Sequence, residues 1–254
     1  MATMDGAIPS GDLKLAAHIA QPARAAAGPR SALVVCHGFP AGPGGALTSA
    51  QTYPDLADHL AAETGWTVLA FNFRGTGESE GNFSLEGWLD DVVAVVDHAV
   101  DMPRIGGVWV AGSSAGGSLA LCAAADDDRI RGVATLAAPA DFDDWASDAR
   151  GLIAQCRSVG VIRDADFPED VEAWTSEFKT VRPLAAVGGI PPRPLLLMHG
   201  SDDSTVPVSD ARALADAADG QADLRVIAGA GHRLRHDPRA IAALMGWMER
   251  QGVG

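Results

Sequence analysis

Short apolar runs rich in β-branched residues, separated by alanine-rich stretches, most strongly limit the folds open to this chain. The runs lie at residues 33–37, 67–71, 107–112, 133–138, 194–199 and 224–228. Helices are predicted at residues 48–64, 84–100, 115–125, 209–218 and 239–250. Strands that are apolar on both faces and joined by helices form mostly parallel sheets covered on both sides. We therefore expect an α/β fold with a sheet of about eight strands, one or two of them edge strands from residues 11–22.

This alternation breaks once, between residues 140 and 194, where no clear core strand occurs. A long insertion between two strands of such a sheet is usually an active-site lid or another functional loop. We expect a single domain over residues 1–254 with a small helical cap inserted at about 140–190. Aromatic side chains in a cap are more often core than substrate contacts, and Phe142, Trp145 and Trp174 are the candidates for the substrate pocket.

Residues 112–116 read Gly-Ser-Ser-Ala-Gly and lie between a predicted strand and a predicted helix. A serine on such a sharp turn is held at positive φ, which requires small residues two positions before and two positions after it. Gly112 and Gly116 meet this requirement for Ser114. In the alternative frame Ser113 would be flanked by two alanines, which is less permissive. Ser114 is therefore the predicted nucleophile.

A serine hydroxyl needs a base that takes its proton and an acid that orients the base. Only one of the seven histidines, His232, lies in a glycine-rich loop after the last predicted strand. The segment at 199–207, which follows another predicted strand, offers Asp202 and Asp203 as the acid. An acid after the preceding strand, Asp141, is a further alternative.

Taken together, these motifs resemble the α/β-hydrolase superfamily. The resemblance is to its small esterase branch, which has cinnamoyl- and feruloyl-esterase-like and serine-aminopeptidase-like members. The matching landmarks are His-Gly-Phe at 37–39, the Arg-Gly-Thr-Gly loop at 73–81, the turn around Ser114, His-Gly-x-x-Asp-x-x-Val-Pro at 199–207 and Gly-His at 231–232. The resemblance implies an α/β-hydrolase fold and a Ser114–Asp203–His232 triad, and it selects Asp203 over Asp202.

The tetrahedral intermediate formed at such a serine needs two backbone N–H donors for its oxyanion. We expect one from Ala115, the residue after the nucleophile. The other is expected from Phe39, since Pro40 has no N–H and the resemblance implies the same residue. The mechanism is then a two-step transfer through an acyl-enzyme, with a small or aryl carboxylic ester as substrate and no cofactor or metal. The alternatives are an aminopeptidase or an acyl thioesterase on the same triad, or a non-catalytic binding member of the fold.

Charge and cysteine usage exclude other classes of partner. The chain has 33 acids against 19 bases, a net charge of −14, so nucleic acid and acidic membrane surfaces are poor partners. Three widely spaced cysteines and the absence of a signal-like N-terminus lead us to expect a cytoplasmic protein. The pair His232 and His236 lacks a third metal ligand. The sequence leaves the oligomeric state open between monomer and homodimer.

Overall fold

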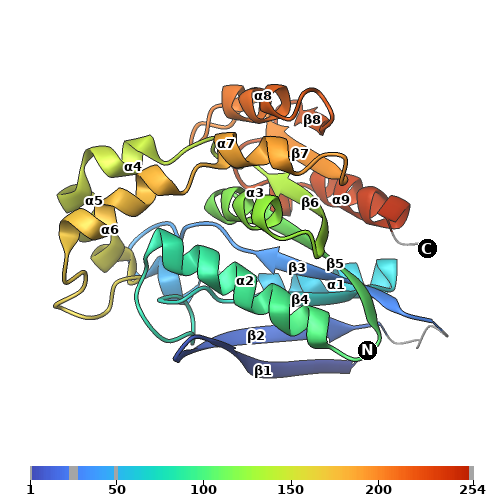
Figure 1. Cartoon of the computed structure of the whole chain (residues 1–254), viewed down its shortest axis with the longest axis horizontal. Coiled ribbons are helices and arrows are strands. Elements are labelled where there is room, and N and C mark those ends of the chain that lie inside the picture. Colours follow the sequence, from blue (N-terminus) through green and yellow to red (C-terminus); the bar gives the residue numbers. More distant parts are fainter. Residues whose placement is uncertain (1, 23–27, 49–50, 252–254) are drawn as a thin grey trace.

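A single eight-stranded sheet organises the molecule. The computed structural model describes residues 2–22, 28–48 and 51–251. The strand order is β1-β2-β4-β3-β5-β6-β7-β8, antiparallel at β1–β2 and β2–β4 and parallel at every other pair (Figure 1). The strands are β1 (Ala2–Ser10), β2 (Leu13–Gln21), β3 (Arg30–Cys36), β4 (Thr67–Phe71), β5 (Ile105–Ser113), β6 (Ile130–Leu136), β7 (Leu195–Gly200) and β8 (Asp223–Ile227). The predicted α/β fold with a mostly parallel sheet is confirmed.

The edge of the sheet contains the strand predicted near the start of the chain and a second strand that precedes it. One or two such strands were expected from residues 11–22; β2 comes from that segment, and β1 precedes it. Gly11, at φ 56°, lies in the tight turn that joins them. The small and polar residues of β1 show no strand pattern in the sequence. The strand is stabilised instead by its pairing with β2 along nine positions.

Helices cover both faces of the sheet, as Figure 1 shows. The principal ones are α1 (Tyr53–Thr64), α2 (Leu85–Asp101), α3 (Ala115–Asp126), α8 (Val208–Ala217) and α9 (Pro238–Gln251). Helices α2, α3 and α8 share one apolar cluster with the sheet, and α1 and α9 share the other. Within the described ranges, no helix is long and apolar enough to cross a bilayer.

Helix α1 begins later than the sequence predicted. The expected start was residue 48, but a short 3-10 turn, η1 (Gly45–Leu47), comes first and α1 starts at Tyr53. Residues 49–50 lie outside the described residues. Pro54 explains the later start, since a proline is tolerated in the first turn of a helix but not in its interior.

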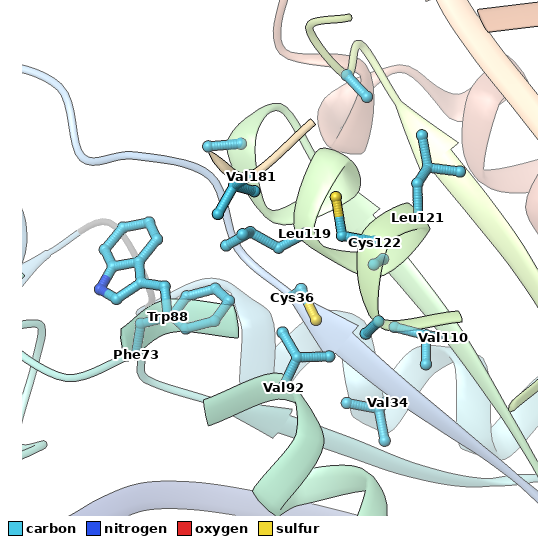
Figure 2. Packing of buried hydrophobic residues seen from close by; sticks show 14 of the residues in the cluster. Val34, Cys36, Phe73, Trp88, Val92, Val110, Leu119, Leu121, Cys122 and Val181 are labelled. Atoms are coloured by element: carbon cyan, nitrogen blue, oxygen red, sulfur yellow. The ribbon is translucent and has the colours of Figure 1, made fainter. Parts of the chain in front are cut away.

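Alternate residues of each central strand face opposite clusters. In β3, Val34 belongs to the cluster under α2 and α3, whereas Leu33 belongs to the cluster under α1 and α9. Figure 2 shows Val34 and Cys36 packed with Val92 of α2 and Leu119 of α3. This alternation on a sheet buried on both sides is why the strands appear in the sequence as continuous apolar runs.

The long segment between β6 and β7 contains no strand and folds into helices. These are α4 (Asp143–Ser147), α5 (Ala149–Val159), α6 (Val171–Thr180) and α7 (Pro183–Ala186), the first three lying together at the left of Figure 1. Asp164 and Arg163 connect this insertion to the loop after β4 through hydrogen bonds. Asn82 donates to the Asp164 carboxylate at 2.7 Å, and the Arg163 guanidinium donates to the carbonyls of Gly77 and Ser79, both at 2.8 Å.

The loop after β4 is held by a buried ion pair. The Arg74 guanidinium donates to Asp91 Oδ1 at 2.7 Å, and the Arg74 N–H donates to Asp91 Oδ2 at 2.8 Å. Ser10 donates to the same carboxylate at 2.8 Å. The Asp91 side chain is completely shielded from solvent. These contacts tie the glycine-rich loop at 73–81 to β1 and α2 and give it a structural role.

Candidate active site

All of the polar residues predicted to act together lie in loops at the carboxyl end of the parallel strands. Ser114 directly follows β5, Asp203 lies in the loop after β7, and His232 lies in the loop after β8. Phe39 belongs to the loop after β3. The carboxyl ends of parallel strands meet at one edge of a sheet, where ligand sites form in open α/β folds.

Ser114 has the strained backbone that its sequence context predicted, with φ 50° and ψ −127°. The flanking glycines are required by close backbone contacts. A Cβ at Gly112 would lie 2.3 Å from the Gly116 carbonyl oxygen, and a Cβ at Gly116 would lie 2.2 Å from the His37 carbonyl oxygen. The turn therefore presents the Ser114 side chain at the end of the sheet.

A continuous hydrogen-bond chain joins Ser114, His232 and Asp203. His232 Nδ1 lies 2.8 Å from Asp203 Oδ2, and His232 Nε2 lies 3.1 Å from Ser114 Oγ. A carboxylate can only accept, so this network assigns the imidazole proton to Nδ1 and leaves Nε2 to accept from the serine hydroxyl. The arrangement can remove a proton from Ser114 while the carboxylate stabilises the resulting imidazolium.

The Asp203 carboxylate is fully satisfied by the protein. Its Oδ1 accepts the N–H groups of Thr205 at 2.8 Å and Val206 at 2.9 Å, and its side chain is shielded from solvent. Burial alone would raise the pKa of Asp203, but the hydrogen bonds from Val206, His232 and Thr205 together hold that pKa below its ordinary value. The carboxylate therefore stays ionised beside the imidazole at neutral pH.

The two alternative acids lie elsewhere. Asp202 is exposed and accepts the Ser201 hydroxyl at 2.6 Å. Asp141 is also exposed and accepts the Asp143 N–H at 3.0 Å within a local turn. In the described part of the chain, neither forms a hydrogen bond with His232.

His199 braces the loop that carries Asp203. The His199 side chain is buried, and its Nε2–H donates to the Val206 carbonyl at 3.0 Å. The same nitrogen lies 3.3 Å from Asp203 Oδ2. His199 thus fixes the segment whose N–H groups hold the carboxylate.

The residue after Ser114 and the loop that carries Phe39 both adjoin the serine. The loop with Phe39 passes directly against the serine, since a Cβ at Gly38 would lie 3.0 Å from Ser114 Cβ. Among the described residues, no carbonyl or side chain accepts a hydrogen bond from the N–H of Phe39 or of Ala115. The Phe39 ring packs on Trp145, with centroids 5.0 Å apart. Two such N–H groups, held in place and unused, can bind a negatively charged oxygen.

His37 positions this loop from inside the core. Its Nδ1–H donates to the Gly38 carbonyl at 2.8 Å, and its Nε2 accepts the Phe73 N–H at 3.2 Å. Its ring packs edge-on against Phe73 and Trp88, with centroids 4.9 and 5.6 Å away. Burial lowers the pKa of His37 to about 4, so the ring is neutral at physiological pH.

We expect His37 to make folding stability depend on pH. Because its folded pKa lies below the value of roughly 6.5 for an unfolded chain, its contribution is complete above that pH and declines as the pH falls towards 4. The shift corresponds to about 3 kcal/mol of unfolding free energy. Urea unfolding at pH 7.5 and pH 4.5 measures it. The wild type should lose about 2 to 3 kcal/mol more over this range than His37→Gln, whereas parallel losses would contradict the assignment.

A pocket of about 250 Å³ opens beside Ser114 and His232. Its wall includes Tyr53, Arg233 and Arg235 together with the loop after β3. The volume is below the range of roughly 300 to 1,000 Å³ common for small-molecule sites, so the pocket suits a compact ligand.

The aromatic residues proposed for the pocket lie instead in the packing beneath the insertion. Phe142 and Trp174 are buried, and Trp174 donates its indole N–H to the Phe83 carbonyl at 3.1 Å. Trp145 is half-buried between Phe142 and Phe39. None of Phe142, Trp145 and Trp174 belongs to the wall of the 250 Å³ pocket. Their structural role is to join the insertion to the loops beside the sheet.

Sequence reasoning missed Tyr53, Arg233 and Arg235. One signal could have found the arginines, because residues 231–236 read Gly-His-Arg-Leu-Arg-His in a chain with a large excess of acids. Residues 2–22, 28–48 and 51–251 contain no cluster of three His, Cys, Asp or Glu side chains that could hold a metal ion. The three cysteines are buried and unpaired.

Comparison with known proteins agrees with this architecture. A family model described as the alpha/beta hydrolase fold matches residues 31–156. An uncharacterized 31.7 kDa protein of Escherichia coli is 33% identical over 122 residues, which are 44% of this chain and 38% of that relative. The chain thus matches less than half the length of the curated relatives.

Solved structures extend the likeness to the whole chain. Est1E from Butyrivibrio proteoclasticus, in the structure with ferulic acid bound, has a TM-score of 0.74 at 22% identity and covers 97% of both chains. Proline iminopeptidase from Mycobacterium smegmatis has a TM-score of 0.68 at 19% identity and covers 97% of this chain and 98% of its own. At these identities the likeness establishes the fold.

Proposed function

We propose that this chain, a member of the α/β-hydrolase superfamily, is a serine hydrolase that cleaves carboxylic esters of small or aryl substrates. The observation that carries the proposal is the hydrogen-bond chain from Asp203 through His232 to Ser114 beside a compact pocket. A hydroxyl, a base and an orienting carboxylate in this sequence constitute the machinery of acyl transfer.

The first half of the reaction forms an acyl-enzyme. Ser114 Oγ attacks the ester carbonyl carbon while His232 Nε2 takes the hydroxyl proton. The carbonyl oxygen becomes an oxyanion, which the N–H groups of Phe39 and Ala115 stabilise. His232 then gives its proton to the departing alcohol as the bond between carbonyl carbon and alkoxy oxygen breaks. Asp203 stabilises the imidazolium throughout this half-reaction.

Water completes the cycle. His232 Nε2 removes a proton from a water molecule, whose oxygen attacks the acyl carbon and forms a second oxyanion in the same place. The bond to Ser114 Oγ breaks, His232 returns the proton to that oxygen, and the carboxylic acid leaves. No atom changes oxidation state in the cycle: the Ser114 proton leaves with the alcohol, and a proton from water restores the Ser114 hydroxyl.

The pocket favours an ester over the free amine of an aminopeptidase substrate. An aminopeptidase needs a carboxylate that holds the substrate ammonium group. Among the described residues, the side chains around the 250 Å³ pocket include Arg233 and Arg235 but no Asp or Glu. The acidic residues of the insertion that could attract an ammonium group, Asp141 and Glu169, do not belong to this wall. Two guanidinium groups would repel the substrate cation.

Covalent labelling and substrate comparison test the proposal together. A fluorophosphonate probe should modify the protein once, and peptide mapping should place the adduct on Ser114. 4-Nitrophenyl butyrate should be hydrolysed, whereas aminoacyl 4-nitroanilides should not. Labelling at another residue would contradict the assignment of Ser114 as the nucleophile. Faster turnover of the anilides would show that the same three residues serve an aminopeptidase.

A further inference from the structure

Two arginines beside the proposed nucleophile have no acidic partner among the residues that the structure describes. Arg233 and Arg235 flank the loop residue Leu234 and both contribute to the pocket wall. In the described part of the chain, neither forms an ion pair or a hydrogen bond with a carboxylate. Arg235 is half-buried, and its Nε is buried without a hydrogen-bond partner. A buried donor without an acceptor destabilises the folded protein, and a ligand that supplies the acceptor removes that cost.

Four other arginines in the molecule have their guanidinium groups paired with carboxylates. Arg74, Arg129, Arg225 and Arg239 each pair with a carboxylate at 2.6 to 2.8 Å. A chain with 33 acids and 19 bases has carboxylates to spare. Arg235 differs from these four arginines because its buried Nε has no acceptor among the described residues.

Tyr53 adds a second unpaired donor at the same place. The Arg235 guanidinium carbon lies 5.2 Å from the centre of the Tyr53 ring, which fixes the two side chains against each other. Tyr53 is 3% exposed, and among the described residues its hydroxyl forms no hydrogen bond of ordinary geometry, although it lies near the Ser113 side chain and the Gly38 backbone. It belongs to the same wall as Ser113 and Ser114. The Tyr53 hydroxyl and the Arg235 guanidinium are thus two neighbouring donors that could bind one acceptor.

The positive charge around the pocket indicates that the missing acceptor is a negatively charged ligand. Among the described residues no Asp or Glu side chain belongs to its wall, and Asp203 already accepts the N–H groups of Thr205, Val206 and His232. A negatively charged ligand is therefore attracted to a pocket in an otherwise acidic molecule. A guanidinium matches the two oxygens of a carboxylate, to which it can donate two parallel hydrogen bonds.

We propose that the substrate is a compact ester that carries a free carboxylate, and that Arg235 and the Tyr53 hydroxyl bind this carboxylate while the ester carbonyl lies at Ser114. Arg233, which is exposed, adds attraction at the entrance. The inference rests on the proposed ester hydrolysis. It adds a specificity-determining residue, Arg235, and a class of substrate to it.

Paired esters that differ in charge test the proposal on the whole chain. The first pair is mono-4-nitrophenyl glutarate and 4-nitrophenyl hexanoate, which places the charge on the acyl side. The second is 4-carboxyphenyl butyrate and its methyl ester, which places it on the alcohol side. In one of the pairs, kcat/KM for the anion should exceed that for the neutral ester by about 10- to 100-fold after subtraction of spontaneous hydrolysis. Sodium chloride should reduce this preference.

Variants assign the preference to its residues. Arg235→Gln should reduce the ratio of the two kcat/KM values at least tenfold, mainly through KM for the anion. Tyr53→Phe, which keeps the ring under the guanidinium, should reduce the ratio by a smaller factor. Arg212→Gln removes the same charge from an exposed position on α8 and should leave the ratio unchanged.

The outcomes separate this proposal from the function on which it rests. Equal kcat/KM values within both pairs, or a preference that survives Arg235→Gln, would overturn the carboxylate site while Ser114-dependent hydrolysis stands. If the fluorophosphonate fails to label Ser114 and no ester is cleaved, the proposed function falls. Calorimetric titration of the protein with glutarate then tests the carboxylate site independently of ester hydrolysis. The wild type must bind glutarate, and Arg235→Gln must not.

Discussion

Replacing Ser114 with alanine is expected to lower kcat for 4-nitrophenyl butyrate by about 10⁴-fold or more, since removal of the nucleophile from such a unit disables all of its members. Alanine keeps the Cβ that the turn already accommodates at φ 50°, so the fold should be retained. Steady-state hydrolysis with the spontaneous rate subtracted measures the first effect. Thermal unfolding followed by circular dichroism measures the second.

The matched control for that variant is the neighbouring serine. Ser113 belongs to the same pocket wall but forms no hydrogen bond with His232 among the described residues. Ser113→Ala should therefore stay within about tenfold of the wild type, a loss that corresponds to no more than one ordinary hydrogen bond. The nucleophile is misassigned if the two variants lose activity equally, or if Ser114→Ala keeps a tenth of the activity.

What could be predicted from the sequence is what depends on neighbours in the chain. The strained turn at Ser114 follows from two glycines at fixed spacing, and the backbone contacts of Gly112 and Gly116 show why no other residue fits there. The central strands were predictable because each must be apolar on both faces. The convergence of Ser114, His232 and Asp203 then follows from their positions after parallel strands.

The pocket wall could not be predicted because it is assembled from segments far apart in the chain. Tyr53 comes from the first turn of α1, whose start the alanine-rich pattern misplaced, and Arg235 lies in a short turn after β8. The aromatic residues of the insertion depend equally on distant contacts. Trp174 is buried and donates its indole N–H to the Phe83 carbonyl, a contact between residues 91 positions apart that no local pattern encodes.

Asp203→Asn is expected to lower kcat by about 10³- to 10⁴-fold while leaving the loop in place. The asparagine oxygen can still accept the N–H groups of Thr205 and Val206. Its amide nitrogen then faces His232 Nδ1 and can only donate, so the imidazole must accept there and carry its proton on Nε2. In that tautomer Nε2 faces Ser114 Oγ with a hydrogen and cannot take the hydroxyl proton. Ester hydrolysis under saturating substrate measures the loss.

Asp202→Asn provides the control that the sequence itself suggests, because the two aspartates are adjacent and spacing alone does not separate them. Asp202 is exposed, and among the described residues its carboxylate accepts a hydrogen bond only from the Ser201 hydroxyl. The same change in charge and size should therefore alter kcat by less than about threefold, the effect of a weak surface interaction. Equal losses from the two variants would show that the charge of the loop matters, and that the tautomer of His232 does not. A loss confined to Asp203→Asn, with an unchanged midpoint of thermal unfolding, would assign the effect to the orientation of the imidazole.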